Sequence, residues 1–152
     1  NDMPNRVLLV EDEPLEAEIL VAILENAGYQ VMTMHDPQDA VRMLETNPFD
    51  FVLSDYMMPG MNGLQVLRRA RHYQPESVRM LITSKGDFDM AIEAINRGEV
   101  YRFLPKPVDA RELTVSLRLA GERMTMAKEV ERLKSELRKR DAALRELQEK
   151  GE

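Results

Sequence analysis

Arg-Val-Leu-Leu-Val-Glu-Asp-Glu-Pro, residues 6–14, is a short aliphatic run that ends abruptly in three acidic residues and a proline. Such a run of branched aliphatic side chains is typical of a strand buried in a sheet. A proline at the start of a helical pattern, with Gly28 just beyond its end, is typical of a helix. The stretch therefore predicts a buried strand over 6–10, acidic residues at its carboxyl end, and a helix over 14–27.

The same alternation of strand and helix patterns continues along the chain. Further strands are expected at 30–34, 50–54, 78–83 and 100–104, and further helices at 38–46, around Leu64, Leu67 and Ala70, and at 88–97. Short strands that alternate with helices predict βαβ units with right-handed crossovers and a parallel sheet buried on both faces. We therefore expect an α/β fold, in which function lies at the carboxyl ends of the strands.

From Asp109 onward the pattern is helical to the end of the chain. Apolar residues recur in steps of three and four at Leu113, Leu117, Ala120, Met124 and Ala127, and then at Val130, Leu133, Leu137, Leu144 and Leu147, with Arg140 in the seam. The step from Ala127 to Val130 is three residues where four is due. We therefore expect a first stretch that packs on the sheet and a second that forms a short coiled coil. The predicted boundary separates residues 1–121 from a helical segment at 122–152.

Composition narrows the classes of function. Of the 152 residues, 43% are apolar, which suffices for a core, and no cysteine is present, which excludes disulfides and thiolate chemistry and is compatible with a reducing cytosol. No apolar run approaches the roughly 20 residues that a membrane span needs. The net charge of −6 is concentrated in residues 1–108. This acidic portion argues against nucleic acid as a direct partner and suits a body that binds a cation.

Polar residues stand at the ends of four predicted strands. These groups are Glu11-Asp12-Glu13, Asp55, Thr83-Ser84 and Pro105-Lys106-Pro107. A single charged residue at a strand end is usually just solvated, but a parallel sheet would bring all four groups into one crevice. Crowded carboxylates repel unless a hard cation such as Mg²⁺ lies between them. A carboxylate can itself accept a phosphoryl group, while a lysine and a hydroxyl bind its oxygens, so the set suits phosphoryl transfer.

Four motifs carry a family resemblance: Val-Glu-Asp-Glu-Pro (10–14), Leu-Ser-Asp-Tyr-Met-Met-Pro-Gly-Met-Asn-Gly (53–63), Leu-Ile-Thr-Ser (81–84) and Phe-Leu-Pro-Lys-Pro (103–107). In order and spacing they resemble the signature blocks of response-regulator receiver domains, over residues 6 to about 121. The resemblance implies a flavodoxin-like fold, with a five-stranded parallel sheet in the order 2-1-3-4-5, helices on both faces and a long C-terminal helix. Glu at position 11, Ser84 and Asn62 depart mildly from the commonest pattern, without removing a group that the chemistry needs.

The resemblance also implies roles for single residues. Asp55 becomes the phosphoacceptor, with Lys106 and Thr83 as the other catalytic groups. The implied Mg²⁺ ligands are Glu11, Asp12, Asp55 and the backbone carbonyl of Met57. Thr83 and Phe103 become the switch pair, in which Phe103 moves inward when Thr83 engages the phosphoryl group. The Lys106–Pro107 peptide bond is expected to be cis.

The partners follow from the resemblance and from the tail. We expect a cytoplasmic response regulator that is not itself an enzyme beyond its self-catalysed phosphorylation and dephosphorylation, and that receives its phosphoryl group from a sensor histidine kinase or a phosphotransfer protein. Residues 124–148 are predicted to form a parallel homodimer. The stretch 94–103, followed by a coiled coil, resembles receivers that precede cyclic-di-GMP phosphodiesterase, cyclase or phosphatase domains, so the chain is expected to be excised from a longer protein with an output domain in cis. A stand-alone receiver that acts as a dimerising interaction module is the alternative.

Three other functions fit less well. A nucleotide-binding domain needs a glycine-rich turn after the first strand, where Glu11-Asp12-Glu13 would instead repel phosphate. A phosphatase with an aspartyl nucleophile commonly has a second acid two residues later, where this chain has Met57. A receiver that cannot be phosphorylated and serves only as a scaffold is disfavoured, because every required group is present.

Overall fold

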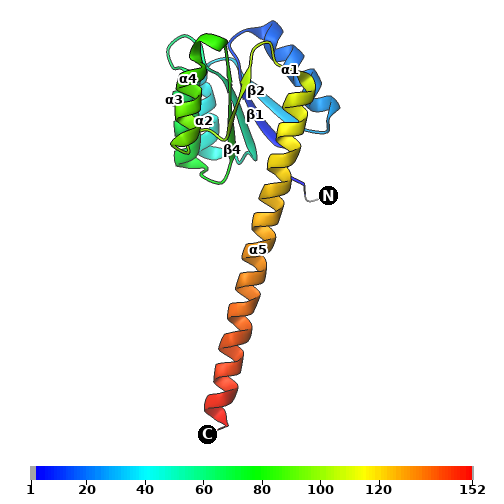
Figure 1. Cartoon of the computed structure of the whole chain (residues 1–152), viewed down its shortest axis with the longest axis vertical. Coiled ribbons are helices and arrows are strands. Elements are labelled where there is room, and N and C mark those ends of the chain that lie inside the picture. Colours follow the sequence, from blue (N-terminus) through cyan, green and yellow to red (C-terminus); the bar gives the residue numbers. More distant parts are fainter. Residues whose placement is uncertain (1–2, 152) are drawn as a thin grey trace. The chain divides into compact units, whose positions relative to one another are not determined.

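In the computed structural model, which describes residues 3–151, strands and helices alternate along the chain (Figure 1). The strands are β1 (Arg6–Val10), β2 (Gln30–Met34), β3 (Phe51–Asp55), β4 (Val78–Thr83) and β5 (Arg102–Pro105). The helices are α1 (Pro14–Asn26), α2 (Pro37–Thr46), α3 (Gly63–Tyr73), the short 3-10 helix η1 (Lys85–Asp87), α4 (Phe88–Asn96) and α5 (Ala110–Lys150). All strand pairs are parallel, in the order β2-β1-β3-β4-β5. The predicted fold class is confirmed.

Local sequence explains where the helices begin and end. Pro14 occupies the first turn of α1, and Gly28 follows that helix with a φ of 98°, in the left-handed region that glycine tolerates best. The Asp36 side chain caps α2 by accepting a hydrogen bond from Gln38 N. β5 begins two residues later than predicted. Gly98, with a φ of 74°, turns the chain after α4, and the strand pairing with β4 starts only at Arg102.

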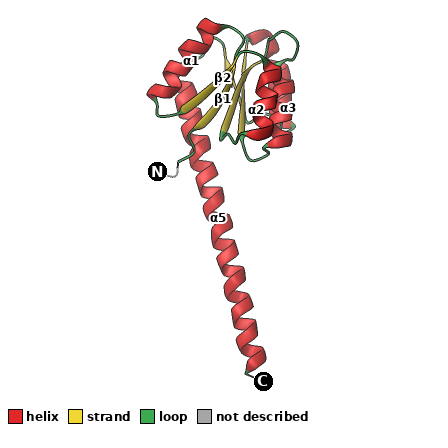
Figure 2. Cartoon of the chain, turned by 180° about the vertical axis from the view of Figure 1, so that it is seen from behind, coloured by secondary structure: helices red, strands yellow, loops and turns green. Residues whose placement is uncertain are grey.

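Helices cover both faces of the sheet. On one face, β1, β3 and β4 pack against α2, α3 and α4 in a single apolar cluster that includes Leu8, Val52, Leu81, Leu44, Leu67 and Ala94. Figure 2 shows α1 on the opposite side of the sheet from α2 and α3. Because both faces are covered, the central strands are buried along nearly their whole length, and every residue of β3 is buried, Asp55 included.

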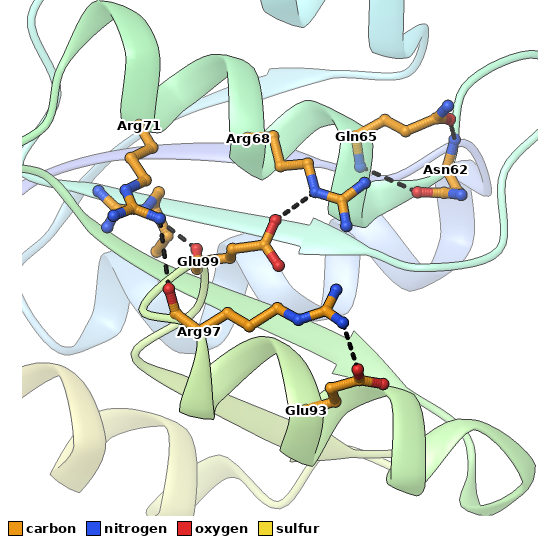
Figure 3. A network of polar contacts seen from close by, with 8 residues as sticks. Asn62, Gln65, Arg68, Arg71, Glu93, Arg97 and Glu99 are labelled. Atoms are coloured by element: carbon orange, nitrogen blue, oxygen red, sulfur yellow. Dashed lines mark hydrogen bonds and ion pairs between the residues drawn. The ribbon is translucent and has the colours of Figure 1, made fainter.

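Polar contacts hold α3 at its start and along its length (Figure 3). At its start, Asn62 and Gln65 form a capping box, in which each side chain accepts a hydrogen bond from the other residue's backbone N–H. Farther along the helix, Arg68 forms an ion pair with Glu99, in the segment that follows α4. Such exposed pairs contribute little stability, but the capping box sets the position of the helix start, which lies next to Asp55.

The long helix α5 belongs to two compact units. Residues 5–118 form the first unit, and residues 119–151, with Met3 and Pro4, belong to the second. Within the first unit, Leu113 and Leu117 are fully buried. The predicted buried stripe does not continue to Ala127, however, because that residue is exposed.

The second unit carries an exposed apolar stripe of its own. It consists of Leu119, Met126, Val130, Leu133, Leu137, Leu144 and Leu147, each at least 43% exposed. We call this set the exposed heptad stripe. Its spacing keeps one heptad register, with arginines at two of the intervening seam positions, Arg123 and Arg140. Ala127, at which the predicted first stretch ends, lies outside this register, and the helix carries two distinct apolar stripes. Within residues 3–151, no helix combines the length and the apolar character that crossing a bilayer requires.

Candidate functional site

The strand order places the predicted site residues side by side. β3 lies between β1 and β4, with Val10 opposite Ser54 and Asp55 opposite Ile82. Thr83 lies opposite Pro105 at the end of β5. Glu11 and Lys106, which directly follow β1 and β5, are therefore carried to the same edge of the sheet as Asp55 and Thr83.

Asp55 and Lys106 form a close ion pair. Asp55 is 3% exposed, and its Oδ1 lies 2.8 Å from Lys106 Nζ. Burial opposes the charge on Lys106, but the hydrogen bond and the charge of Asp55 outweigh it, so the pKa of Lys106 is raised. The backbone N–H of Lys106 donates to Thr83 O at 2.9 Å, and the Lys106–Pro107 peptide bond is cis, as expected.

Three carboxylates gather beside this ion pair. Glu11, Asp12 and Asp55 each offer a carboxylate oxygen, and these atoms all lie within 4.8 Å of one another. Burial raises the pKa of Glu11 to about 9, with further contributions from hydrogen bonds to Glu16 and Asp55 and from the charge of Asp55, while Lys106 opposes the shift. Glu11 therefore keeps its proton at neutral pH when no cation is bound, because three adjacent carboxylates cannot all ionise without positive charge between them.

Three polar atoms in this crevice point to a bound group. Among residues 3–151, Glu11 Oε2, Asp55 Oδ1 and Thr83 Oγ1 are buried and have no hydrogen-bond partner, although Asp55 Oδ1 has its ion pair with Lys106. Buried polar atoms of this kind usually have a partner, which can be an ion or a ligand. Together with the clustered carboxylate oxygens, they fit a hard divalent cation such as Mg²⁺. The Met57 side chain is 67% exposed, and the ligand role of its backbone carbonyl stays a prediction.

The predicted switch residues lie on adjoining strands. Thr83 ends β4 and is 1% exposed, and Phe103 is half-buried in β5 opposite Leu81. The ring of Phe103 packs against the ring of Phe88, with their centroids 4.9 Å apart. The two residues therefore lie on neighbouring strands, and their motion stays a prediction.

Sequence reasoning missed two residues that contact the site. Glu16 Oε2 lies 3.7 Å from Lys106 Nζ. Its place in the first turn of α1, which directly follows the acidic end of β1, could have indicated that it lies near the same crevice. Gly63 begins α3, and a Cβ atom built there would lie 2.0 Å from the backbone oxygen of Asp55. The sequence shows a glycine in the loop, but the approach of this backbone to Asp55 requires the fold.

Comparison with curated proteins gives relatives that are transcriptional regulators. The C4-dicarboxylate transport transcriptional regulatory protein DctD of Rhizobium meliloti is 33% identical over 123 residues, which cover 81% of this chain and 26% of the relative. The hydrogenase transcriptional regulatory protein HoxA of Cupriavidus necator is 30% identical over 146 residues, which cover 96% of this chain and 30% of the relative. The chain thus spans less than a third of the length of these two relatives.

Solved structures match over most of this chain. A structure described as adenylate cyclase from Rhodopirellula baltica is 29% identical, with a TM-score of 0.77, and the match covers 88% of this chain and 98% of that one. The signal receiver domain of an HD domain-containing protein from Pseudomonas fluorescens is 31% identical, with a TM-score of 0.76, and the match covers 85% of this chain and 95% of that one.

A family model completes the comparison. The model described as the response regulator receiver domain matches residues 7–118, which contain β2 to β5, all of β1 except Arg6, and every predicted site residue. With the strand order and the matching solved structures, this result shows that the chain belongs to the response regulator receiver domain family, which acts in two-component signalling.

Proposed function

We propose that this chain is a phosphoacceptor in which Asp55 takes a phosphoryl group from a histidine kinase or a phosphotransfer protein in a Mg²⁺-dependent reaction. The observation that carries the proposal is the buried Asp55 carboxylate, paired with Lys106 at 2.8 Å and lying within the three-carboxylate cluster. A buried aspartate that served only the fold would not need two further carboxylates beside it, because they oppose its ionisation.

The groups around Asp55 support an in-line displacement at phosphorus. A carboxylate oxygen of Asp55 forms the new O–P bond while the bond from phosphorus to the donor's nitrogen or oxygen breaks, and the leaving group keeps that bond's electron pair. Lys106 offsets negative charge on the phosphoryl oxygens, and Thr83 donates its hydroxyl hydrogen to one of them. Glu11, Asp12, Asp55 and the Met57 carbonyl would hold Mg²⁺, which when bound supplies positive charge to the carboxylates and the phosphoryl oxygens.

The same contacts support the switch. The buried hydroxyl of Thr83 has no partner within residues 3–151, so engaging a phosphoryl oxygen would satisfy it. Movement of Thr83 toward Asp55 would change the packing beside Phe103, whose half-buried ring then moves inward. This motion would alter the surface formed by β4, β5 and their flanking helices, which other domains can read.

Wild-type protein is expected to gain one phosphoryl group from acetyl phosphate in the presence of Mg²⁺, and to gain none when a chelator removes the ion. The reason is that the carboxylate cluster repels an anionic donor unless a cation neutralises it. Intact-mass spectrometry of both samples, taken before the acyl phosphate hydrolyses, measures the difference. Equal labelling with and without Mg²⁺ would contradict the metal-dependent reaction.

Glu11→Gln is expected to stabilise the Mg²⁺-free protein at alkaline pH while weakening Mg²⁺ binding at least about tenfold. Because the folded-state pKa of Glu11 is raised from 4.5 to about 9, folding favours its protonated form. The stability that protonated Glu11 contributes is complete below the pKa of the unfolded chain, 4.5, and is lost as pH rises through about 9. Between these two pH values, the free energy of unfolding of the wild type should therefore fall more than that of the variant.

Urea unfolding at several pH values in chelator, with Mg²⁺ titration by calorimetry, checks both effects of the Glu11 substitution. Glu13→Gln is the matched control, since Glu13 is an exposed glutamate close to Glu11 in the sequence. A Glu11→Gln variant with the pH dependence and the Mg²⁺ affinity of that control would show that Glu11 takes no part in the cluster.

We further propose that residues 124–148 form a parallel homodimer and that the long helix relays the switch to an output domain in cis. The exposed heptad stripe supports this, because one helix cannot bury a seam of that length by itself. A cyclic-di-GMP enzyme is the proposed output. The transcriptional regulators among the relatives support an output domain that regulates transcription as a second candidate, and a stand-alone receiver that dimerises is the remaining alternative. The full-length reading frame would show which output domain, if any, follows the helix and would distinguish these three possibilities.

Leu137→Glu is expected to raise the dimer dissociation constant by at least about 100-fold, because two buried leucines are replaced by two charges in the seam. Ala142→Glu is the control, since it adds the same charge at an exposed position outside the exposed heptad stripe. Sedimentation equilibrium of the full chain over a range of concentrations measures both. A wild-type monomer at every concentration, or equal effects of the two substitutions, would refute the dimer.

A further inference from the structure

Lys106 has a second carboxylate partner besides Asp55. Its Nζ lies 2.8 Å from Asp55 Oδ1 and 3.7 Å from Glu16 Oε2. Asp55 comes from the end of β3 and Glu16 from the first turn of α1, so the ammonium group lies between two elements. The Glu16 side chain is 44% exposed, which places it toward the solvent side of the buried Asp55.

Glu16 is also linked to the metal-ligand cluster. A hydrogen bond with Glu11 lowers the pKa of Glu16 despite partial burial, and Lys106 acts in the same direction. The crevice therefore contains four carboxylates, two of which, Asp55 and Glu16, pair with Lys106. Glu16 lies outside both the phosphoacceptor and the metal-ligand roles described above.

We propose, on the basis of the phosphoacceptor function proposed above, that Glu16 is a positioning residue that holds Lys106 before phosphorylation and competes with the phosphoryl group for its ammonium. Phosphorylation converts the Asp55 carboxylate into an acyl phosphate, and the negative charge moves to phosphoryl oxygens that carry roughly −1.5 to −2. Lys106 must then turn from two carboxylates to the phosphoryl group. Glu16 keeps its charge throughout, so it both retains the ammonium and repels an anionic donor.

The competition predicts a direction for the effect. Glu16→Gln keeps the size of the side chain and removes its charge, which frees Lys106 and lowers the repulsion. One unit charge at such a partly exposed site changes an interaction by about 1 kcal/mol, which is roughly a fivefold change in rate. We therefore expect the variant to be phosphorylated by acetyl phosphate about three to ten times faster than the wild type at saturating Mg²⁺.

A structural role for Glu16 makes a different prediction. An acidic residue in the first turn of a helix stabilises the positive end of the helix dipole. That role would change unfolding but leave the labelling rate the same. Glu18→Gln is the matched control, because it removes one charge from an exposed position on the same helix. It should change the labelling rate less than about twofold.

The kinetic experiment compares the wild type, Glu16→Gln and Glu18→Gln at low and high ionic strength. The advantage of Glu16→Gln should shrink in high salt, because salt screens the charge of a partly exposed group. A labelling rate for Glu16→Gln equal to that of Glu18→Gln, or slower than that of the wild type, would overturn the proposal.

A double-mutant cycle tests the contact without any phosphorylation. Urea unfolding of Glu16→Gln, Lys106→Met and the double variant in chelator should show coupling of about threefold in the unfolding constant, and the cycle of Glu18 with Lys106 should show none. Zero coupling for Glu16 overturns the proposal. If the wild type is never labelled, the proposed function fails and the competition fails with it. If Glu16 and Lys106 are still coupled in that case, the contact between them exists and only the proposed phosphoacceptor function is wrong.

Discussion

Asp55→Asn is expected to lose all Mg²⁺-dependent labelling by acetyl phosphate, a fall of at least about a thousandfold. The amide lacks the anionic oxygen that forms the bond to phosphorus, and it is a weaker ligand for Mg²⁺. The fold should persist, because the amide has nearly the same shape and Lys106 keeps Glu16 as a neighbour at 3.7 Å. Removing one of three crowded carboxylates also relieves repulsion in the absence of the ion.

The measurement is intact-mass spectrometry of the variant beside the wild type, with circular dichroism to confirm folding. Asp89→Asn is the control, because Asp89 is an exposed aspartate on α4. It should be labelled as the wild type is. Labelling of Asp55→Asn at the wild-type rate, or at a different residue, would remove Asp55 from the role of phosphoacceptor.

Gly63→Ala is expected to destabilise the protein by about 3 kcal/mol, at the upper end of what overpacking costs. An added Cβ would lie 2.0 Å from Asp55 O and 2.8 Å from Asp55 C, and both of these atoms belong to the backbone. No side-chain rotation can relieve that overlap. Either the start of α3 or the end of β3 must move, and the hydrogen bond from Gly63 N to Tyr56 O, now 2.8 Å, is strained or lost.

Because the added Cβ would overlap the backbone of Asp55, Gly63→Ala should also weaken Mg²⁺ binding in the fraction that remains folded. Gly86→Ala is the matched control. Within the part of the chain that the structure describes, no atom lies within 4 Å of a Cβ at Gly86, so its effect should stay within about 0.5 kcal/mol. Urea unfolding and Mg²⁺ titration of both variants give the comparison. Equal stability of the two would show that α3 can shift without cost.

The elements of the fold and most of the candidate site could be predicted from the amino-acid sequence alone. Strand and helix patterns are local, so β1, β2 and β4 have the bounds that their apolar runs predicted. Glu11, Asp55, Thr83 and Lys106 could be predicted as site residues from their places at the strand ends, because the carboxyl ends of the strands in a parallel sheet lie at one edge. The strand order came from the family resemblance, since strand patterns alone do not say which strands pair.

Tertiary structure decided the contacts between distant residues. Glu16 and Lys106 are ninety positions apart in the sequence, and their approach depends on how α1 is placed beside the end of β5. The fit of Gly63 against Asp55 likewise depends on where α3 begins relative to β3.

In helix α5, too, the sequence pattern alone did not show which apolar residues are buried. Its sequence contains apolar residues that satisfy a helical period in more than one way. Leu113 and Leu117 are buried, whereas the heptad stripe from Leu119 to Leu147 is exposed and begins before Ala127, where the pattern had placed the change from the first stretch to the second. Periodicity shows that a helix has an apolar face, but the rotation of that helix against its neighbours decides which residues the core covers.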